Sequence, residues 1–216
     1  FIARMASRYR HQLTILGLGP LTNISRAIQR EPRVIEWTKE LIVMGGAISV
    51  AGNITPHAEF NTYNDPDAAH MVLSSNINTS LVGLDVTTMV SFERVRSRWF
   101  EGNDITTRLS DRILRSWFDS NLTSERYHLH DPLAVVAMLR PDLFSWRRAS
   151  IDVETDDAIH LGKTTATYGA FPSRIASSVQ ADSAAAVVVN MLSSSEDQGV
   201  SGRDPAKPLL QVLQIC

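Results

Sequence analysis

Short, almost continuously apolar runs recur along the chain, each bounded by glycine, charged or turn-forming residues. The clearest of these runs cover residues 13–18, 41–46, 79–86 and 149–154. Continuous apolarity over so few residues is typical of strands that are buried on both faces of a sheet. The pattern therefore predicts buried strands at these positions.

Segments with helical periodicity lie between these strands, at 20–29, 66–75 and 132–140. Each begins with a proline, which is favoured at the first helical position, and each proline follows a residue that can cap a helix. The capping candidates are Gly19, Asp65 and Asp131. Strands that alternate with helices predict crossover connections, so the expected fold class is α/β, with a mainly parallel, Rossmann-like sheet flanked by helices.

Two stretches depart from this alternation. Residues 91–127 combine helical spacing with many charges, which predicts a helical lobe at about this position. Residues 193–208 are polar and rich in breakers, so we expect 193–216 to form a loosely ordered C-terminal tail. Residues 1–192 are expected to form one domain. Phe1 opens a helix-like segment with no capping residue before it, and we expect the parent protein to begin further upstream.

Composition narrows the possible functions and locations. The chain has 216 residues, is 44% hydrophobic and 20% charged, and carries a formal net charge of -2, which argues against a dedicated nucleic-acid binder. No apolar run approaches the roughly 18 residues of a membrane span, so we expect no membrane partner. Cys216 is the single cysteine, which excludes an intramolecular disulfide and favours a reducing, cytoplasmic location.

Polar motifs follow the predicted strands at the edge where ligands bind in parallel α/β sheets. LGLGPLTN follows the first strand, MGGAISVAGNITPHAEFN follows the second, and HLHDPLAV opens the late apolar helix. Common signatures fail, because Thr22 occupies the third glycine position of a dinucleotide fingerprint and Asp157 the first glycine position of a phosphate loop. The motifs predict a site on one rim of the sheet.

The second motif concentrates hydrogen-bonding side chains at Asn53, Glu59 and Asn61. Amide and carboxylate groups suit sugar hydroxyls, and Glu59 and Asn61 would share one face if the backbone were extended. A solvent-facing loop explains the same residues equally well, so both interpretations stay open on local grounds.

The HDP triplet at 130–132 also has two interpretations. Asp131 caps the following helix in the simpler one, which the local sequence favours. In the other, its carboxylate binds a hard cation, and His130 acts as an acid because an imidazole titrates near neutrality.

In order along the chain, LGLGPLTNI, IVMGGA, GNITPHAEFN with DPDAA, GLDVT and HDPLAV resemble the inosine/uridine-preferring nucleoside hydrolase family. The resemblance covers roughly residues 1–190, and several ordered motifs make it more specific than any single one. It implies the nucleoside hydrolase fold, one calcium ion (Ca2+) per subunit, and hydrolysis of a nucleoside to ribose and free base. It also implies a small-molecule nucleoside partner and a homo-oligomer, either a dimer or a tetramer.

The resemblance assigns roles around the implied ion. Asp131 matches the late calcium carboxylate, which also faces the substrate, and Leu18 matches the residue whose backbone carbonyl binds calcium. His130 matches the histidine that protonates the departing base. In the implied mechanism calcium acidifies a water, a carboxylate deprotonates this water, and the water attacks an oxocarbenium-like sugar.

The sugar side is assigned in the same way. Asn53, Glu59 and Asn61 match residues that hold the ribose hydroxyls, with Phe60 alongside the sugar and Met44 at the pocket wall. The contacts to the base are not assigned by the resemblance. Arg126, Tyr127 and His128 are unranked candidates for them and are named separately from the assigned residues.

One family feature has no counterpart in this sequence, the Asp-rich cluster of the D-x-D-x-x-x-D-D kind near the N-terminus. It provides most calcium ligands and the general base, whereas Leu18 and Asp131 would offer about two or three of the six to eight oxygens that calcium takes. We therefore expect this chain alone to be inactive or nearly so. We also expect the first strands of the family's sheet to be missing, which would expose an edge prone to association. The alternatives are a non-catalytic truncated homologue that binds ribosides or a partner and, more weakly, an unrelated nucleotide-binding domain.

Overall fold

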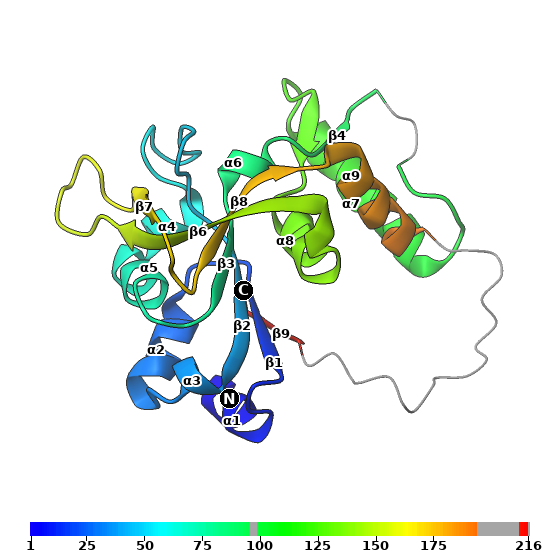
Figure 1. The fold of residues 1–216 in the computed structure, drawn as a ribbon. Helices are drawn as coiled ribbons and strands as arrows, with labels where there is room; N and C mark the ends of the chain where they lie inside the picture. The colour runs from blue at the N-terminus through cyan, green and yellow to red at the C-terminus, as the bar shows by residue number, and fades with distance from the viewer. Residues whose placement is uncertain (96–98, 194–211, 216) are drawn as a thin grey trace.

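A seven-stranded sheet forms the centre of the molecule (Figure 1). The computed structural model describes residues 1–95, 99–193 and 212–215. The strands lie in the order β7-β6-β8-β3-β2-β1-β9. Their bounds are β1 Leu13–Gly17, β2 Thr38–Met44, β3 Thr79–Val82, β6 Phe144–Val153, β7 Thr164–Tyr168, β8 Arg174–Val179 and β9 Val212–Ile215.

The central strands of the sheet are parallel. β1 pairs with β2 and β9 in parallel, and β3 does so with β2 and β8, whereas β6 runs antiparallel to β7 and β8. The predicted α/β class with a mainly parallel sheet is confirmed. β7 and β8 were not predicted, because few of their residues are buried and neither forms a continuous apolar run.

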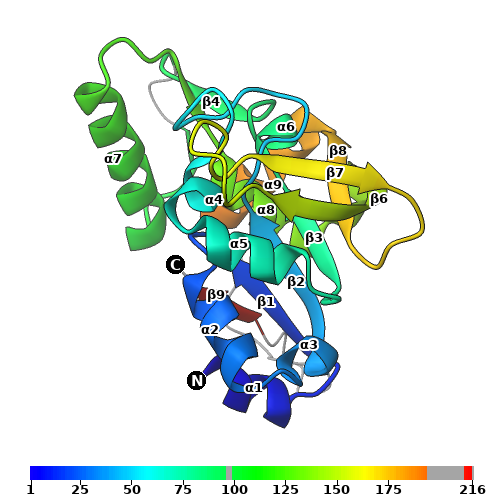
Figure 2. The ribbon, with the colours of Figure 1, turned by 90° about the vertical axis from the view of Figure 1, so that its left-hand side faces the viewer.

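Helices cover both faces of the sheet. α1, α2, α3 and α5 pack on one face and α8 and α9 on the other, and Figure 2 shows α2 and α5 side by side over the sheet. The helix bounds are α1 Ile2–Arg8, α2 Thr22–Arg30, α3 Val34–Trp37, α4 Phe60–Asn64, α5 Pro66–Leu73, α6 Leu84–Thr87, α7 Ile105–Ser120, α8 His130–Leu139, the 3-10 turn η1 Pro141–Leu143 and α9 Ala181–Leu192.

Side chains of β2 alternate between these two cores. Leu41 and Val43 lie with Ile15 of β1 in the core below α2 and α5, and Ile42 and Met44 lie in the core that contains α8. Successive residues of a strand point to opposite faces, so a strand covered on both sides is apolar throughout. This arrangement explains why the sequence pattern predicted the central strands.

The predicted strand at 79–86 is wrong beyond Val82. The chain turns there into the short helix α6, whose Leu84 N–H donates to the carbonyl of Gly46 at 2.9 Å. At Gly83 a Cβ atom would lie 2.9 Å from the Gly46 oxygen, so the turn needs a glycine. Apolar residues continue past the strand because α6 is itself buried.

Only one of the predicted helix caps is observed. The Asp65 side chain accepts a backbone N–H at the start of α5. Gly19 does not cap α2, which begins later, at Thr22. The capping interpretation of Asp131 is also wrong, because α8 begins at His130 and its N-cap position makes no side-chain hydrogen bond.

The predicted helical lobe at 91–127 contains strands as well as a helix. Its main element is α7, which stands at one side of the molecule in Figure 2. Two short strands flank this helix in the sequence, β4 Ser91–Glu93 and β5 Arg126–His128, and they pair antiparallel. The last strand of the lobe, β5, therefore ends directly before the start of α8.

The last described segment, β9, pairs in parallel with the outer edge of β1. The predicted loose tail is therefore wrong for these 4 residues, which form a strand. They also cover the edge of β1 that was expected to be open. The unpaired backbone groups of an edge strand readily accept another strand. The rest of the predicted tail, 194–211 and 216, lies outside the described residues. Within the described ranges, no helix combines the length and apolarity needed to cross a membrane.

Candidate active site

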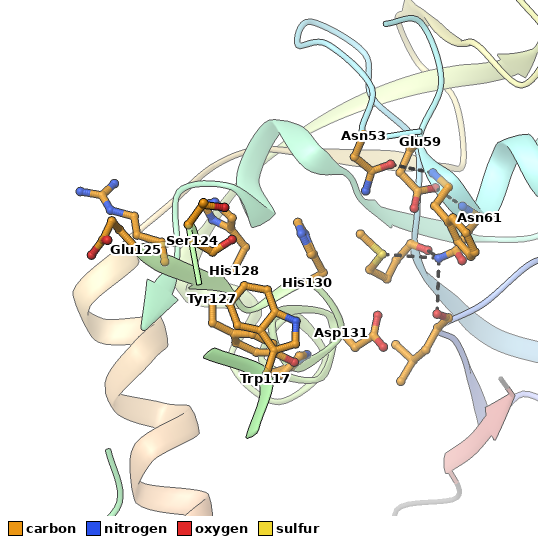
Figure 3. Close-up of a pocket in the computed structure, with 16 residues that line it drawn as sticks. Asn53, Glu59, Asn61, Trp117, Ser124, Glu125, Tyr127, His128, His130 and Asp131 are labelled. Carbon is orange, nitrogen blue, oxygen red and sulfur yellow. Dashed lines mark hydrogen bonds between the residues drawn. The ribbon is translucent and has the colours of Figure 1, made fainter. Parts of the chain in front are cut away.

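A cavity of about 1130 Å³ opens at the carboxyl ends of β1 and β2 (Figure 3). The residues singled out from the sequence for binding or chemistry all line this cavity. They are Leu18, Met44, Asn53, Glu59, Phe60, Asn61, His130 and Asp131. Figure 3 shows Asn53, Glu59 and Asn61 on one side, with His130 and Asp131 facing them.

Glu59 lies at the N-cap of α4, almost completely buried. Its Oε2 accepts backbone N–H groups from Gly46 at 3.1 Å, Asn61 at 2.9 Å and Thr62 at 3.2 Å. Burial raises the pKa of Glu59 above its ordinary value, against the lowering effect of these three bonds. In the described chain Oε1 makes no hydrogen bond, so it is the oxygen left for a ligand.

The backbone is not extended from Glu59 to Asn61, so the condition for their sharing one face of a strand is not met. Glu59 is the last extended residue, and the chain turns helical at Phe60. The two polar side chains meet because a cap folds back over the first helical turn, where backbone N–H groups lack helical partners. Phe60 is 50% exposed, so half of its surface is available at the cavity mouth.

Asn61 is buried and its orientation is determined by its amide hydrogens. Nδ2 donates to the carbonyl oxygen of Met44 at 3.1 Å and reaches that of Leu18 at 3.4 Å. The opposite orientation would place the amide oxygen against two carbonyl oxygens. Oδ1 of Asn61 therefore remains as an acceptor for a ligand.

Asn53 contributes a hydrogen-bond donor, whereas Glu59 and Asn61 offer acceptors. Oδ1 of Asn53 accepts the backbone N–H of Phe60 at 2.8 Å, which leaves the side-chain NH2 as a donor. Together with Oε1 of Glu59 and Oδ1 of Asn61, this cavity wall presents one donor group and two acceptors. Vicinal hydroxyls both donate and accept hydrogen bonds, so they match such a set.

Asp85, which sequence reasoning did not single out, anchors the loop that carries Asn53. Its two carboxylate oxygens accept the backbone N–H groups of Ile48 at 2.9 Å and Ser49 at 2.7 Å. An aspartate near the end of the predicted strand 79–86 gave no signal of this role, because its partners lie 36 and 37 positions away in the sequence.

His130 lies at the first position of α8. Its Nδ1 is 2.7 Å from the hydroxyl oxygen of Thr87 in α6. Burial, and secondarily the neighbouring His128, lower the pKa of His130 to about 4. The ring is therefore neutral at pH 7, and it cannot serve there as a fully charged imidazolium.

Asp131 follows in the first turn of α8, and burial raises its pKa. The Leu18 carbonyl lines the same cavity but already accepts from Asn61. Within the described ranges no group of three or more His, Cys, Asp or Glu side chains could hold a metal ion. These residues by themselves do not fit a calcium ion, which takes six to eight oxygens.

The remaining wall of the cavity combines aromatic side chains with polar and charged ones from residues 123–128. Trp117 of α7 packs edge-on against Tyr127 of β5, with ring centroids 5.0 Å apart, and both line the cavity. Arg126 and His128 line it as well, so the three unranked candidates for base contacts lie at one site. Trp117 was missed, because its place in a charged helical segment gave no hint that α7 reaches the cavity.

The mainly parallel α/β sheet with helices on both faces is the nucleoside hydrolase fold, which two solved structures share. A plant nucleoside hydrolase superposes with a TM-score of 0.80 at 23% identity, covering 88% of this chain and 65% of that one. A purine-preferring ribonucleoside hydrolase from Gardnerella vaginalis gives a TM-score of 0.76 at 24% identity, covering 85% and 61%.

The particular family follows from sequence. The family described as inosine-uridine preferring nucleoside hydrolase matches residues 1–194, and this chain belongs to it. Uridine nucleosidase 1 of Arabidopsis thaliana is 33% identical over 78% of this chain and 51% of its own length. The inosine-uridine preferring nucleoside hydrolase of Leishmania major is 32% identical over 72% and 50%. The chain thus spans about half the length of these curated relatives.

Proposed function

We propose that the cavity binds a ribonucleoside and that the activity of this domain is hydrolysis of its N-glycosidic bond to ribose and free base. The observation that carries the proposal is the pairing of two acceptors and one donor on the wall formed by Asn53, Glu59 and Asn61. Family membership supports the same reaction. Phe60 would lie along the sugar and Met44 at the cavity wall.

In the proposed reaction the bond between the anomeric carbon and the base nitrogen breaks. Its electron pair passes to the base, which takes up a proton, and a water oxygen attacks the anomeric carbon and loses a proton. Hydrogen bonds from the wall of the cavity to the ribose hydroxyls would orient the sugar, and a hydrogen-bond donor at His130 would stabilise the departing base. The aromatic side chains of Trp117 and Tyr127 would border the base.

The proposal includes candidate ligands for a calcium ion but not a complete calcium site. Leu18 and Asp131 are the candidate ligands, and the described residues do not complete a calcium site around them. We therefore expect the purified chain to bind ribosides but to turn them over slowly. This shortage of carboxylates is also what favours the second candidate function, a homologue that binds ribosides without cleaving them.

Base release distinguishes the two. Purified residues 1–216 are incubated with uridine and inosine, with calcium or with a chelator, and free base is quantified by chromatography. Little or no release is expected in either condition, together with saturable nucleoside binding. Release that the chelator abolishes would show a complete cation site and refute the expected inactivity, and absence of nucleoside binding would refute both functions.

A further inference from the structure

The short helix α6 connects the two sides of the cavity. Asp85 in its first turn holds the loop before Asn53, and Thr87 at its end contacts His130. Thr87 is fully buried, with 0% of its surface exposed. In the described part of the chain, its hydroxyl has the His130 ring as its single hydrogen-bond partner.

The direction of this hydrogen bond follows from the cost of leaving a buried donor unpaired. If Nδ1–H of His130 donated to Thr87, the buried hydroxyl hydrogen would have no acceptor, and an unsatisfied buried donor costs about 1–3 kcal/mol. If the hydroxyl donates to Nδ1, its hydrogen is satisfied and only oxygen lone pairs remain unused. A neutral imidazole carries its single hydrogen on the nitrogen that is not accepting.

We infer that Thr87 is a positioning residue for His130: its hydroxyl donates to Nδ1, so that Nε2 faces the cavity and carries the hydrogen of the neutral ring. The ring cannot rotate by half a turn without losing this bond. Thr87 thus makes His130 a hydrogen-bond donor toward the cavity and prevents it from acting there as a base.

The use of this hydrogen rests on the proposed function. As the glycosidic bond breaks, negative charge develops on the base, and an Nε2–H group directed at it is stabilising. The tautomer itself does not depend on that function, so the two ideas can fail separately.

Nitrogen-15 NMR of the imidazole rings tests the inference directly, at about pH 7.5, above the ordinary pKa of histidine. In the wild type, Nε2 of His130 should be protonated and Nδ1 should resonate as a hydrogen-bonded, unprotonated nitrogen. Thr87→Val keeps the shape but removes the hydroxyl, so Nδ1 should move to the position of an unbonded nitrogen. The ratio of Nε2–H to Nδ1–H forms should fall about tenfold, the effect of one ordinary hydrogen bond.

Two further variants complete the experiment. Thr87→Ser restores the hydroxyl and should restore the wild-type Nδ1 resonance. Thr88→Val is the matched control, because that hydroxyl donates to the Leu84 carbonyl and not to a ring. A wild-type ring protonated on Nδ1, or a Thr87→Val ring whose Nδ1 resonance equals that of the wild type, would overturn the inference. The wild-type spectrum decides the direction even if a variant does not fold, and nucleoside hydrolysis is assayed separately.

Discussion

The carboxylate of Glu59 accepts the backbone N–H of Gly46 at 3.1 Å, although the two residues lie 13 positions apart. The same oxygen caps α4, so one side chain joins the turn after β2 to the helix that carries Asn61. The proposed sugar contact and the local hydrogen bonds therefore use different oxygens of one carboxylate, and variants can separate them.

Glu59→Gln should separate these effects, because an amide oxygen can replace Oε2 while the NH2 group replaces Oε1. Riboside affinity should fall about tenfold with a small change in stability, since a charged acceptor is lost at the ligand. Glu59→Ala should also lower the free energy of unfolding, by about 2–4 kcal/mol, because buried N–H groups lose their acceptor. Calorimetric titration and urea unfolding measure the two quantities, and equal stability losses in both variants would contradict the division.

Asp85→Asn should weaken riboside binding from a distance. One of the two oxygens that hold Ile48 and Ser49 becomes an NH2 group, which cannot accept, so the loop before Asn53 loosens. We expect affinity to fall about three- to tenfold for the loss of one such bond. Asp119→Asn, at an exposed position of α7, is the control and should bind as the wild type does. Unchanged affinity in Asp85→Asn would show that the loop holds its position without this anchor.

Acidification should destabilise the fold partly through His130. Its pKa is about 4 in the folded chain and about 6.5 in the unfolded chain, so the unfolded state binds more protons between these values. The stabilising contribution is complete above about pH 6.5 and is lost as the pH falls toward 4.

His130→Gln isolates that contribution, because the raised pKa values of Glu59 and Asp131 act with the opposite sign and are common to both proteins. The difference in free energy of unfolding between wild type and variant should change across pH 4 to 6.5 and stay constant above it. Urea unfolding at several pH values measures it. A difference that does not vary with pH would show that His130 titrates normally in the folded chain.

Calcium should stabilise the chain only weakly. Because the described residues offer an incomplete ligand set, we expect a dissociation constant of about 1 mM or higher, which at about 1 mM calcium corresponds to no more than about 0.4 kcal/mol. Thermal unfolding with calcium and with a chelator measures this, and Asp131→Asn should remove what effect exists. A large calcium-dependent rise in melting temperature, absent in that variant, would reveal further ligands.

The sequence predicted those features that depend on local pattern. β1 and β2 are apolar throughout because both faces are covered, and α5 begins where Asp65 and Pro66 indicated. The family motifs singled out eight residues, and all eight line the cavity. Their roles in binding and chemistry remain predictions, to be decided by the experiments above.

The features missed depend on contacts between distant segments. The apolar pattern predicts a strand up to residue 86, although α6 begins at Leu84, because burial makes this helix of four residues as apolar as the strand before it. Asp85, Thr87 and Trp117 acquire their places only when α6 meets the loop after β2 and the start of α8, and when α7 meets β5. The polar pattern predicts a loose tail where β9 lies, because pairing with β1 depends on the unpaired edge of that strand and not on local periodicity.

Calorimetric titration with inosine tests most directly whether this wall of the cavity binds a sugar. Asn53→Ala removes the donor of the wall at an exposed position, and Asn64→Ala removes an exposed amide that donates to the Phe60 carbonyl outside the cavity. The account predicts saturable binding by the wild type, about tenfold weaker binding by Asn53→Ala, and wild-type affinity in Asn64→Ala. No binding by the wild type, or equal affinity in all three proteins, would contradict it.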